Sequence, residues 1–382
     1  MIATVAIIIM IIYLILIGSL TYGLDNVEEF KLQDIKSKTK FSVLIPFRNE
    51  AHNLPRLLDS ILKLNYPKDL FEVILVNDDS EDDSVDTINK ILDTKSSKKD
   101  FTRIDIKTIQ NIRVSNSPKK DAITSAIKFS KHEWIITTDA DCQLPKYWLE
   151  TFDEYIQNKS LNCILAPVTY SSNSTFLNRF QTLDMLSLQA ATIGGFGLHK
   201  PFLCNGANFA YRKLTFNIVN GFDGNTAIAS GDDIFLLEKF KTQDPKKVAY
   251  LRSLKATVYT QPVSGFQQLI QQRLRWASKT SHNPNLFSKL LGLIIFMANL
   301  VCVILFPLVI FNLISSRIAI ALLVIKFGID FLLLFKIARF FKQENILLSF
   351  ISSSLIYPFF NIFIVFLSLF KSYSWKGRTF RK

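Results

Sequence analysis

Cysteine and histidine are scarce in this chain of 382 residues, which contains four of each. No two cysteines form a C-x-x-C pair, so neither a zinc site nor a disulfide framework is expected. Glycine-rich phosphate loops are also missing: the sequence has no Walker A motif, and no G-x-G-x-x-G follows its first expected strand. Any nucleotide would therefore have to be held by side chains and a metal ion.

Acidic residues are outnumbered, with 32 Asp and Glu against 45 Lys and Arg, which gives a net charge of +13. A basic balance of this size suits nucleic acid, anionic lipid or phosphorylated ligands. No nucleic-acid-binding motif is visible, and basic residues stand next to apolar runs. We therefore expect a membrane as partner and no nucleic acid.

Charge is absent from residues 2–20, a run long enough to span a bilayer. No basic start and no small-residue cleavage site mark it as a signal peptide, so we expect an uncleaved anchor. Lysines follow this run and none precedes it, which places the chain from about residue 22 onward in the cytoplasm. We expect an integral protein of the bacterial inner membrane, with an anchor over 1–22, a cytosolic domain over 23–285 and membrane helices over 286–382.

The C-terminal apolar stretches, roughly 290–313, 317–337 and 345–370, conflict with the basic tail that follows them. Three full crossings would place that tail outside, whereas its charge favours the inside. Either 290–313 is re-entrant or lies flat, or the charge bias is overridden. Within 317–337, Lys326 and Asp330 share a helix face as a structural ion pair or as the lining of an acceptor or product path.

The segment between the apolar runs alternates strand and helix patterns. This alternation predicts an α/β domain with a parallel sheet, in which ligands bind beyond the carboxyl ends of the strands. Acids follow two of the expected strands, as Asp78-Asp79 and as Asp139-Ala-Asp141. The expected strands are 41–47, 71–77, 103–109 and 133–138, and the expected helices are 48–64, 85–92 and 121–130.

Asp139 and Asp141 are spaced to act on one ion. Hard carboxylate oxygens suit Mg²⁺ or Mn²⁺. Such an ion needs only one or two protein carboxylates when substrate phosphates supply the remaining ligands. By itself this spacing occurs in many loops, but its place after a buried strand favours a metal site.

Six motifs occur in a fixed order: FSVLIPFRNE, VILVNDDSEDDS, TTDADCQLP, NGANFAYRK, SGDDIFL and QQRLRW. Together they resemble family 2 glycosyltransferases of the GT-A fold, in the membrane-bound branch that carries a Q-x-x-R-W motif. That branch includes cellulose, hyaluronan and poly-N-acetylglucosamine synthases and lipid glucosyltransferases. The resemblance covers about residues 41–280 and implies a Rossmann-like domain that binds a nucleotide sugar, flanked by membrane helices.

The resemblance implies roles for individual residues on the donor side. Asp78 and Asp79 would contact the base and ribose together with Glu50, although the usual D-D-G is D-D-S here. Asp139 and Asp141 would hold a divalent ion on the diphosphate and stabilise the leaving group. Lys120, in the segment PKKDA, would lie near the nucleotide, although the glycine that often precedes this lysine is absent.

For the acceptor side, the resemblance implies roles for residues in the motifs SGDDIFL and NGANFAYRK. By resemblance Asp233 is the general base for the acceptor hydroxyl, with Asp232 beside it. The alternative is that one of these acids only caps the following helix. Asn205, Gly206 and Asn208 are candidate acceptor contacts, and a plain turn is nearly as good an interpretation.

QQRLRW lies on an expected helix that begins near residue 265, where Ser264 and Gln267 form a capping box. Gln272, Arg275 and Trp276 share one face of this helix. The resemblance implies that Arg273 or Arg275 contacts the diphosphate, and that Trp276 forms the floor of the acceptor site beside Gln272. The alternative is an interfacial helix with its arginines on lipid headgroups.

The resemblance implies an inverting, metal-dependent glycosyltransferase that uses a UDP-sugar. At most four spans are visible, few to enclose a secretion channel, so a lipid acceptor at the cytoplasmic face is favoured over a glycan. The alternative is a processive polysaccharide synthase, and a non-catalytic nucleotide-sugar-binding membrane protein is a further rival. The sugar, the linkage and the oligomeric state are left open.

Overall fold

The computed structural model describes residues 2–96, 104–171 and 175–380. Its contacts divide the chain into two units. We call them the sheet unit, Glu28–Ser171 with Cys204–Gln261, and the helical unit, Met1–Val27 with Ser172–Leu203 and Pro262–Lys382. Residues 172–203 and 262–285, which we expected within the cytosolic domain, thus group with the apolar helices.

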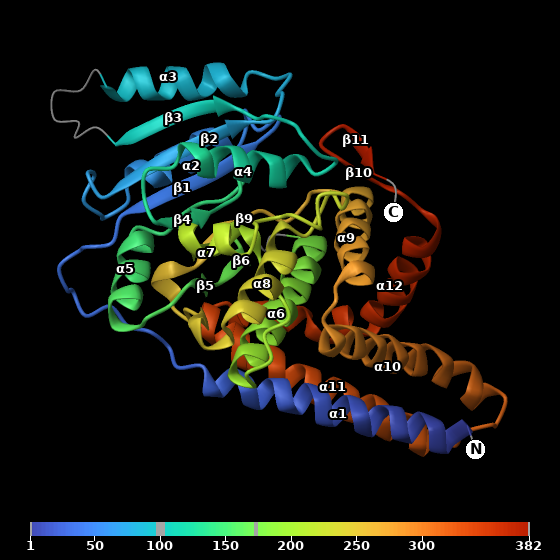
Figure 1. Ribbon diagram of the computed structural model, residues 1–382. Helices are drawn as coiled ribbons and strands as arrows, with labels where there is room; N and C mark the ends of the chain where they lie inside the picture. The colour runs from blue at the N-terminus through green and yellow to red at the C-terminus, as the bar shows by residue number, and fades with distance from the viewer. Residues whose placement is uncertain (1, 97–103, 172–174, 381–382) are drawn as a thin grey trace. The chain divides into compact units, whose positions relative to one another are not determined.

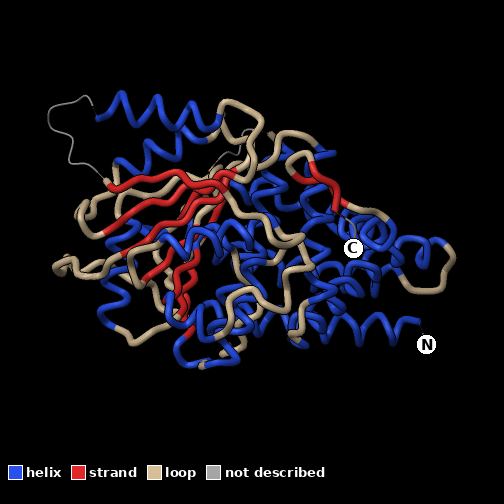
Figure 2. The backbone as a smooth tube through the Cα atoms, turned by 45° about the horizontal axis from the view of Figure 1, so that its top comes forward, coloured by secondary structure: helices blue, strands red, loops and turns tan. Residues whose placement is uncertain are grey.

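The sheet unit is built on a seven-stranded sheet of order β3-β2-β1-β4-β7-β5-β8 (Figure 2). β1 is parallel to both β2 and β4, and β2 is parallel to β3. β7 is antiparallel to β4 and β5, so the expected parallel arrangement ends at β4. The strands are β1 Phe41–Phe47, β2 Phe71–Asn77, β3 Asp105–Gln110, β4 Trp134–Thr137, β5 Cys163–Leu165, β7 Phe209–Arg212 and β8 Val248–Tyr250, and a separate parallel pair is β6 Val168–Tyr170 with β9 Val258–Thr260.

Helices connect these strands and bury their apolar faces on the sheet (Figure 1). Leu54, Leu57, Leu58 and Ile61, which share one face of α2, are all fully buried, as the helical spacing predicts. Arg103, the first residue of the predicted third strand, lies outside the described residues. The helices are α2 Leu54–Leu62, α3 Ser84–Ser96, α4 Pro118–Phe129, α5 Trp148–Asn158, α7 Lys213–Ile218 and α8 Asp232–Gln243, with short turns η1 Gly206–Asn208, η2 Pro245–Lys247 and η3 Leu254–Ala256.

The register of the strands brings the acidic loops to one edge. Phe47 pairs with Asn77 at the ends of β1 and β2, and Leu44 pairs with Thr137 at the end of β4. The carboxyl ends of these three parallel strands therefore open on the same side. This is the edge at which parallel α/β sheets bind ligands.

An extended segment before β1 is anchored by two fully buried acids of α5. Glu154 accepts hydrogen bonds from the backbone N–H groups of Gln33 (2.6 Å) and Ile35 (3.1 Å). Asp153 likewise accepts from Lys38 (3.2 Å) and Thr39 (2.9 Å). Because buried charges are costly without such partners, these acids fix the path by which the chain enters the sheet.

The helical unit contains four helices that are long and apolar enough to cross a membrane: Ile2–Asn26, Leu286–Ile310, Ser316–Phe341 and Glu344–Phe370. The stretch 290–313, suspected of being re-entrant, forms a continuous helix with Pro307 near its end. The elements of this unit are α1 Ile2–Asn26, α6 Phe176–Gly197, α9 Phe266–His282, α10 Leu286–Ile310, α11 Ser316–Phe341, η4 Glu344–Ser349, α12 Phe350–Phe370 and the hairpin β10 Tyr373–Trp375 with β11 Arg378–Phe380.

Glycines allow two of these helices to touch. A Cβ on Gly23 of α1 would collide with the backbone of Gly194 in α6, and one on Gly197 would collide with Gly23. Small residues that let backbones approach are a common means of packing membrane helices. The α1–α6 crossing thus depends on these three glycines.

Candidate active site

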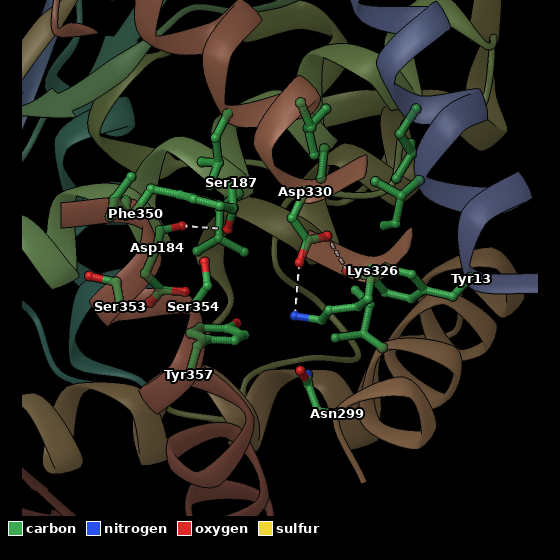
Figure 3. Close-up of a pocket in the computed structure, with 18 of the residues that line it drawn as sticks. Tyr13, Asp184, Ser187, Asn299, Lys326, Asp330, Phe350, Ser353, Ser354 and Tyr357 are labelled. Carbon is green, nitrogen blue, oxygen red and sulfur yellow. Dashed lines mark hydrogen bonds and ion pairs between the residues drawn. The ribbon is translucent and has the colours of Figure 1, made fainter. Parts of the chain in front are cut away.

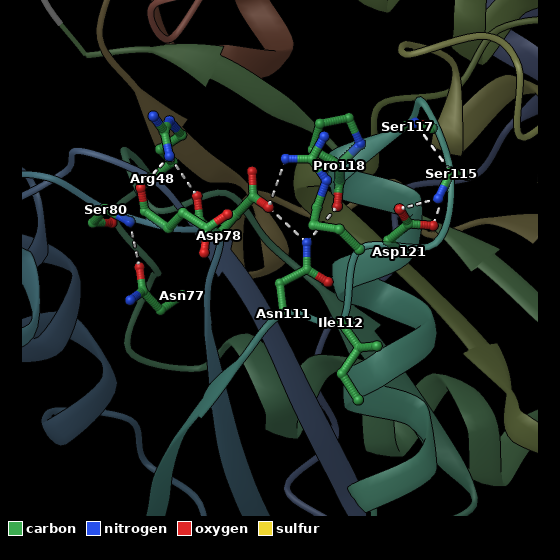
Figure 4. A network of polar contacts seen from close by, with 12 residues as sticks. Arg48, Asn77, Asp78, Ser80, Asn111, Ile112, Ser115, Ser117, Pro118 and Asp121 are labelled. Atoms are coloured by element: carbon green, nitrogen blue, oxygen red, sulfur yellow. Dashed lines mark hydrogen bonds and ion pairs between the residues drawn. The ribbon is translucent and has the colours of Figure 1, made fainter.

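Asp78 stands where β2 ends and is held from two sides (Figure 4). Its backbone N–H donates to the Phe47 carbonyl at 2.9 Å. Its carboxylate accepts a hydrogen bond from Asn111 Nδ2 at 2.7 Å and lies 3.6 Å from Arg113 Nη1. The carboxylate is buried but stands at the sheet edge, where it can accept hydrogen bonds from a ribose or a base.

Asp79 and Glu50 have more local partners. Asp79 is an exposed residue in the left-handed region, at φ +55°. The guanidinium of Arg48 donates to the carbonyl oxygens of both Asp78 (2.9 Å) and Asp79. Glu50 is buried and accepts from Asn53 Nδ2 at 2.7 Å, while its own N–H donates to Ser84 Oγ at 2.8 Å. The contacts shown here order the turn before α2, and a contact of Glu50 with a nucleotide stays a prediction.

Lys119 lies between two motifs that are far apart in the sequence. Its Nζ atom is 2.7 Å from Asp139 Oδ1 and 3.1 Å from Asp232 Oδ2. Burial alone would lower the pKa of Lys119, but the carboxylates of Asp139, Asp232 and Asp233 outweigh burial and raise it well above its usual value. The ammonium group is therefore charged throughout the usual pH range and joins the D-x-D segment to the G-D-D segment.

Lys120, which we predicted near the nucleotide, is directed elsewhere. Its Nζ atom donates to the carbonyl oxygens of Asn225 (2.6 Å) and Ile228 (2.8 Å), and its side chain is almost fully buried. Adjacent positions on a helix differ by about 100°, so only one of the two lysines of PKKDA can face the edge. In the structure that lysine is Lys119, and the predicted place of Lys120 near the nucleotide stays a prediction.

Asp232 and Asp233 begin α8, as the capping alternative expected, but they also reach across the edge. Asp233 accepts from the N–H of Ile234 at 2.8 Å and from the N–H of Gly206 at 3.3 Å. A Cβ on Gly206 would lie 2.8 Å from Asp232 Oδ2 and 3.4 Å from Lys119 Nζ. Glycine is therefore required here by the close approach of the two acids and the lysine.

The residues of the NGAN turn, 205–208, differ in what the structure shows for them. Asn205 accepts from the N–H of Ala207 at 3.0 Å and so caps the short turn η1. Asn208 is fully buried: it accepts from Trp148 Nε1 (2.9 Å) and donates to the carbonyls of Pro167 (2.7 Å) and Ala256 (2.8 Å). Its amide therefore makes three hydrogen bonds within the core, and the predicted acceptor contact of Asn208 stays a prediction.

The acids after β4 suit a divalent ion that a substrate brings with it. Within residues 2–96, 104–171 and 175–380, no group of three or more His, Cys, Asp or Glu side chains could hold a metal ion. Asp139 and Asp141 are both partly exposed, with 39% of the Asp139 side chain accessible. Two open carboxylates fit Mg²⁺ or Mn²⁺ when a diphosphate supplies the other oxygens.

The Q-x-x-R-W segment forms the helix α9, as predicted, but this helix belongs to the helical unit instead of the expected cytosolic domain. Its buried Arg273 is paired with Asp184 of α6, with Nε at 2.8 Å and Nη2 at 2.7 Å from Oδ2. Arg273 also donates to Gln272 and lies 4.2 Å from the ring centre of Trp276. This buried ion pair disagrees with a diphosphate contact by Arg273.

Arg275 lies 5.2 Å from the ring centre of Trp375 in the C-terminal hairpin, whose following residues Arg381 and Lys382 are outside the described part. Both Arg275 and Trp276 are partly exposed. Their predicted contacts with the diphosphate and with the acceptor, and that of Gln272, stay predictions.

Sequence reasoning missed several partners at the edge. Arg48 was quoted within a motif but given no role, although it organises the backbone at Asp78 and Asp79. Asn111 and Arg113 follow β3 and could have been found, because polar residues at that strand end point to the same edge. Asp184 carried no signal, since it is a single acid within α6 and belongs to none of the six motifs.

Comparison with known proteins agrees with this geometry. Residues 42–218 match the sequence profile of Glycosyl transferase family 2. The chain is 29% identical over 196 residues to "Probable glycosyltransferase YdaM" of Bacillus subtilis (strain 168), over 50% of this chain and 44% of that protein. It is 24% identical over 181 residues to poly-beta-1,6-N-acetyl-D-glucosamine synthase of Staphylococcus aureus (strain COL), over 46% and 39% respectively. The matches thus span less than half the length of each relative.

A solved structure resembles the chain over most of its length. The mannosyltransferase PcManGT from Pyrobaculum calidifontis, in complex with GDP-Man and Mn²⁺, superposes with a TM-score of 0.60 over 93% of this chain and 98% of that chain. At 15% sequence identity this likeness establishes the fold alone. It confirms the predicted GT-A fold, accompanied by one apolar helix at the N-terminus and three toward the C-terminus.

Proposed function

We propose that this chain is a membrane-bound, inverting glycosyltransferase, because residues 42–218 match the sequence profile of Glycosyl transferase family 2. It transfers a sugar from a UDP-linked donor to a lipid acceptor at the cytoplasmic face of the bacterial inner membrane. The observation that carries the proposal is the contact of Asp139 and Asp232 with one ammonium group, that of Lys119. This contact joins a candidate donor segment to a candidate acceptor segment.

The donor's nucleoside is assigned to the end of β2. Asp78 accepts from the ribose or base, and its own position is fixed by Asn111 and Arg113. Asp139 and Asp141 would hold Mg²⁺ or Mn²⁺ together with oxygens of the substrate. When bound, that ion neutralises charge on the departing nucleoside diphosphate. Lys119 adds a second positive charge at the same edge.

Asp233 is assigned the role of general base. Two backbone N–H groups orient its carboxylate at the start of α8. It takes the proton of the acceptor hydroxyl as that oxygen bonds to the anomeric carbon. The bond from that carbon to the diphosphate oxygen breaks, and its electron pair leaves with the nucleoside diphosphate. One displacement inverts the anomeric centre, and no covalent intermediate with the protein forms.

A processive polysaccharide synthase is the second candidate. The similarity to a poly-beta-1,6-N-acetyl-D-glucosamine synthase favours it, as does the segment QQRLRW. Four helices of the described chain are apolar enough to cross a membrane, which are few to enclose a secretion channel. A lipid acceptor is therefore preferred. A product made on a lipid in that membrane stays in it, whereas a long polymer does not.

Product analysis tests the proposal. Membranes that contain the full chain are supplied with radiolabelled UDP-glucose, UDP-galactose or UDP-N-acetylglucosamine, with and without Mg²⁺ or Mn²⁺. The label is then partitioned between an organic phase and an acid-insoluble polymer. We expect metal-dependent label in the organic phase. Label in polymer supports the synthase instead, and bound donor with no product and no released UDP would support a non-catalytic protein.

A further inference from the structure

The helical unit contains a cavity to which the residue roles proposed above assign nothing (Figure 3). We call it the chamber. It holds about 970 Å³ of empty space, part of it open to the surroundings, among α1, α6, α10, α11 and α12. Most of its lining is apolar, but nine polar side chains reach it, among them Tyr13, Asp184, Asn299, Lys326 and Asp330. Polar groups are rare among membrane helices, and they generally mark a functional site.

The charges that face the chamber neutralise one another. Lys326 Nζ lies 2.8 Å from Asp330 Oδ2, and Tyr13 donates its hydroxyl proton to Asp330 Oδ1. Asp184 is paired with Arg273 at 2.7 Å. Each cation therefore has a carboxylate partner, and the chamber as a whole is neutral. A neutral ligand fits this arrangement better than an anionic one.

Two buried polar atoms on the chamber wall have unused hydrogen-bonding capacity. Asn299 is 1% exposed and Ser353 is 5% exposed. Among the described residues, neither Asn299 Oδ1 nor Ser353 Oγ finds a hydrogen-bond partner. Figure 3 shows the Asn299 amide pointing into the empty space near Lys326. A buried acceptor without a partner is unfavourable, and a ligand hydroxyl group would satisfy it.

A second, separate pocket is an apolar groove on the same two helices. The chamber touches α1 at Tyr13 and α10 at Asn299. The groove takes up the adjoining turns, from Ile2 to Ile9 of α1 and from Met297 to Leu308 of α10. Its lining residues are all apolar. A chamber with polar groups on its wall, next to a purely apolar groove, matches the two parts of an amphiphile.

We propose that the helical unit binds a membrane lipid with an uncharged, hydroxyl-bearing headgroup, with the headgroup in the chamber and a hydrocarbon chain in the groove. The headgroup hydroxyl donates to Asn299 Oδ1 and accepts from the Lys326 ammonium. The role of this lipid as the acceptor rests on the proposed function, whereas its binding does not. Its hydroxyl belongs to a glycerol or to a sugar, and the test separates the two.

The test measures lipid binding to the full-length protein in nanodiscs, in the absence of any nucleotide sugar. The probes are dioleoylglycerol, a monoglucosyl dioleoylglycerol and the anionic dioleoylphosphatidic acid, which share the same chains. The variant is Asn299→Leu, which keeps the side-chain size but removes the acceptor. The matched control is Asn361→Leu. Asn361 lies on the apolar helix α12, and its Oδ1 atom also has no hydrogen-bond partner among the described residues. Unlike Asn299, it does not line the chamber.

We expect the two uncharged lipids to bind more tightly than phosphatidic acid, and Asn299→Leu to weaken their binding about tenfold while Asn361→Leu leaves it unchanged. Tighter binding of the glucosyl lipid assigns the headgroup hydroxyl to a sugar, and tighter binding of dioleoylglycerol assigns it to glycerol. Ser353→Ala provides a second, milder variant with a loss in the same direction.

Equal or tighter binding of phosphatidic acid would overturn the neutral headgroup. Equal effects of Asn299→Leu and Asn361→Leu would overturn the chamber as the binding site. Binding is read without turnover, so the two proposals fail separately. A lipid that binds in the chamber but receives no sugar would retain this inference and remove the acceptor role. Sugar transfer to a lipid whose affinity is unchanged by Asn299→Leu would retain the proposed transfer to a lipid and remove the chamber as its binding site.

Discussion

Replacing Lys119 with methionine removes the charge that joins Asp139 to Asp232 and nearly preserves the volume of the side chain. The ammonium group lies 2.7 and 3.1 Å from the two carboxylates, and the side chains of Lys119 and Asp232 are only 16% and 10% exposed. Removing one partner of a fully buried ion pair costs about 3–5 kcal/mol. The Asp139 side chain is 39% exposed, so water shares part of its charge and we expect about 2–4 kcal/mol.

The raised pKa of Lys119 fixes how this loss depends on pH. A lysine whose folded pKa lies above its unfolded value contributes its full stability below the unfolded value, and loses it only as pH rises through the folded one. The effect of Lys119→Met is therefore constant between neutral and mildly alkaline pH. It is measured by thermal unfolding of the sheet unit within the full-length protein.

Millimolar Mn²⁺ should partly restore the stability of Lys119→Met, because the ion replaces the missing charge between the carboxylates. Lys120→Met is the matched control. It leaves two backbone carbonyls without their ammonium partner but changes no charge between Asp139 and Asp232. We expect destabilisation in both variants and selective restoration by Mn²⁺ in Lys119→Met. Equal responses to Mn²⁺, or an unchanged melting temperature for Lys119→Met, would refute this reasoning.

Three other variants test the structure more widely. Burial would raise the pKa of Glu72, but hydrogen bonds to its carboxylate, including one from Lys107 at 2.9 Å, outweigh burial and lower it. Glu72→Gln should therefore lower the free energy of unfolding by about 3 kcal/mol at pH 7, measured by chemical unfolding. This difference in stability between wild type and variant should shrink below about pH 4, as the wild-type carboxylate is protonated. Asn208→Ala should lower the free energy of unfolding by about 2–4 kcal/mol, because it abandons three buried partners, whereas a direct acceptor contact would instead raise KM at unchanged stability. Asp184→Asn should destabilise the helical unit by about 3–5 kcal/mol and Arg273→Met should recover part of that loss in the double variant; a double variant no more stable than Asp184→Asn would count against the ion pair.

The first half of the sheet unit could be predicted because its signals are local. Residues 41–47 and 71–77 are mostly apolar runs, and the structure has β1 and β2 at those bounds. The second half gave no such signal, since β5, β6, β8 and β9 are three residues each. The antiparallel β7 is fixed by pairing with β4 and β5, a non-local effect that no short window contains.

The site was predictable in its acids and less so in their partners. Strand ends locate Asp78 and Asp139 because parallel strands share one edge. The choice between Lys119 and Lys120 depends on where α4 begins, and boundaries are the least certain feature of a sequence-based prediction. The partner of Arg273, Asp184, is 89 positions away along the chain, so no local pattern reveals it.

The most direct test of the account is the rate of sugar transfer by Asp233→Asn in a single turnover at saturating donor. Asp244→Asn is the matched control, because Asp244 also accepts a hydrogen bond from a nearby backbone N–H (3.1 Å) but caps the turn η2. We predict that Asp233→Asn transfers about 10²- to 10⁴-fold more slowly, with unchanged donor affinity, and that Asp244→Asn behaves as wild type. A rate within tenfold of wild type, or a loss explained by donor affinity alone, would contradict Asp233 as the base.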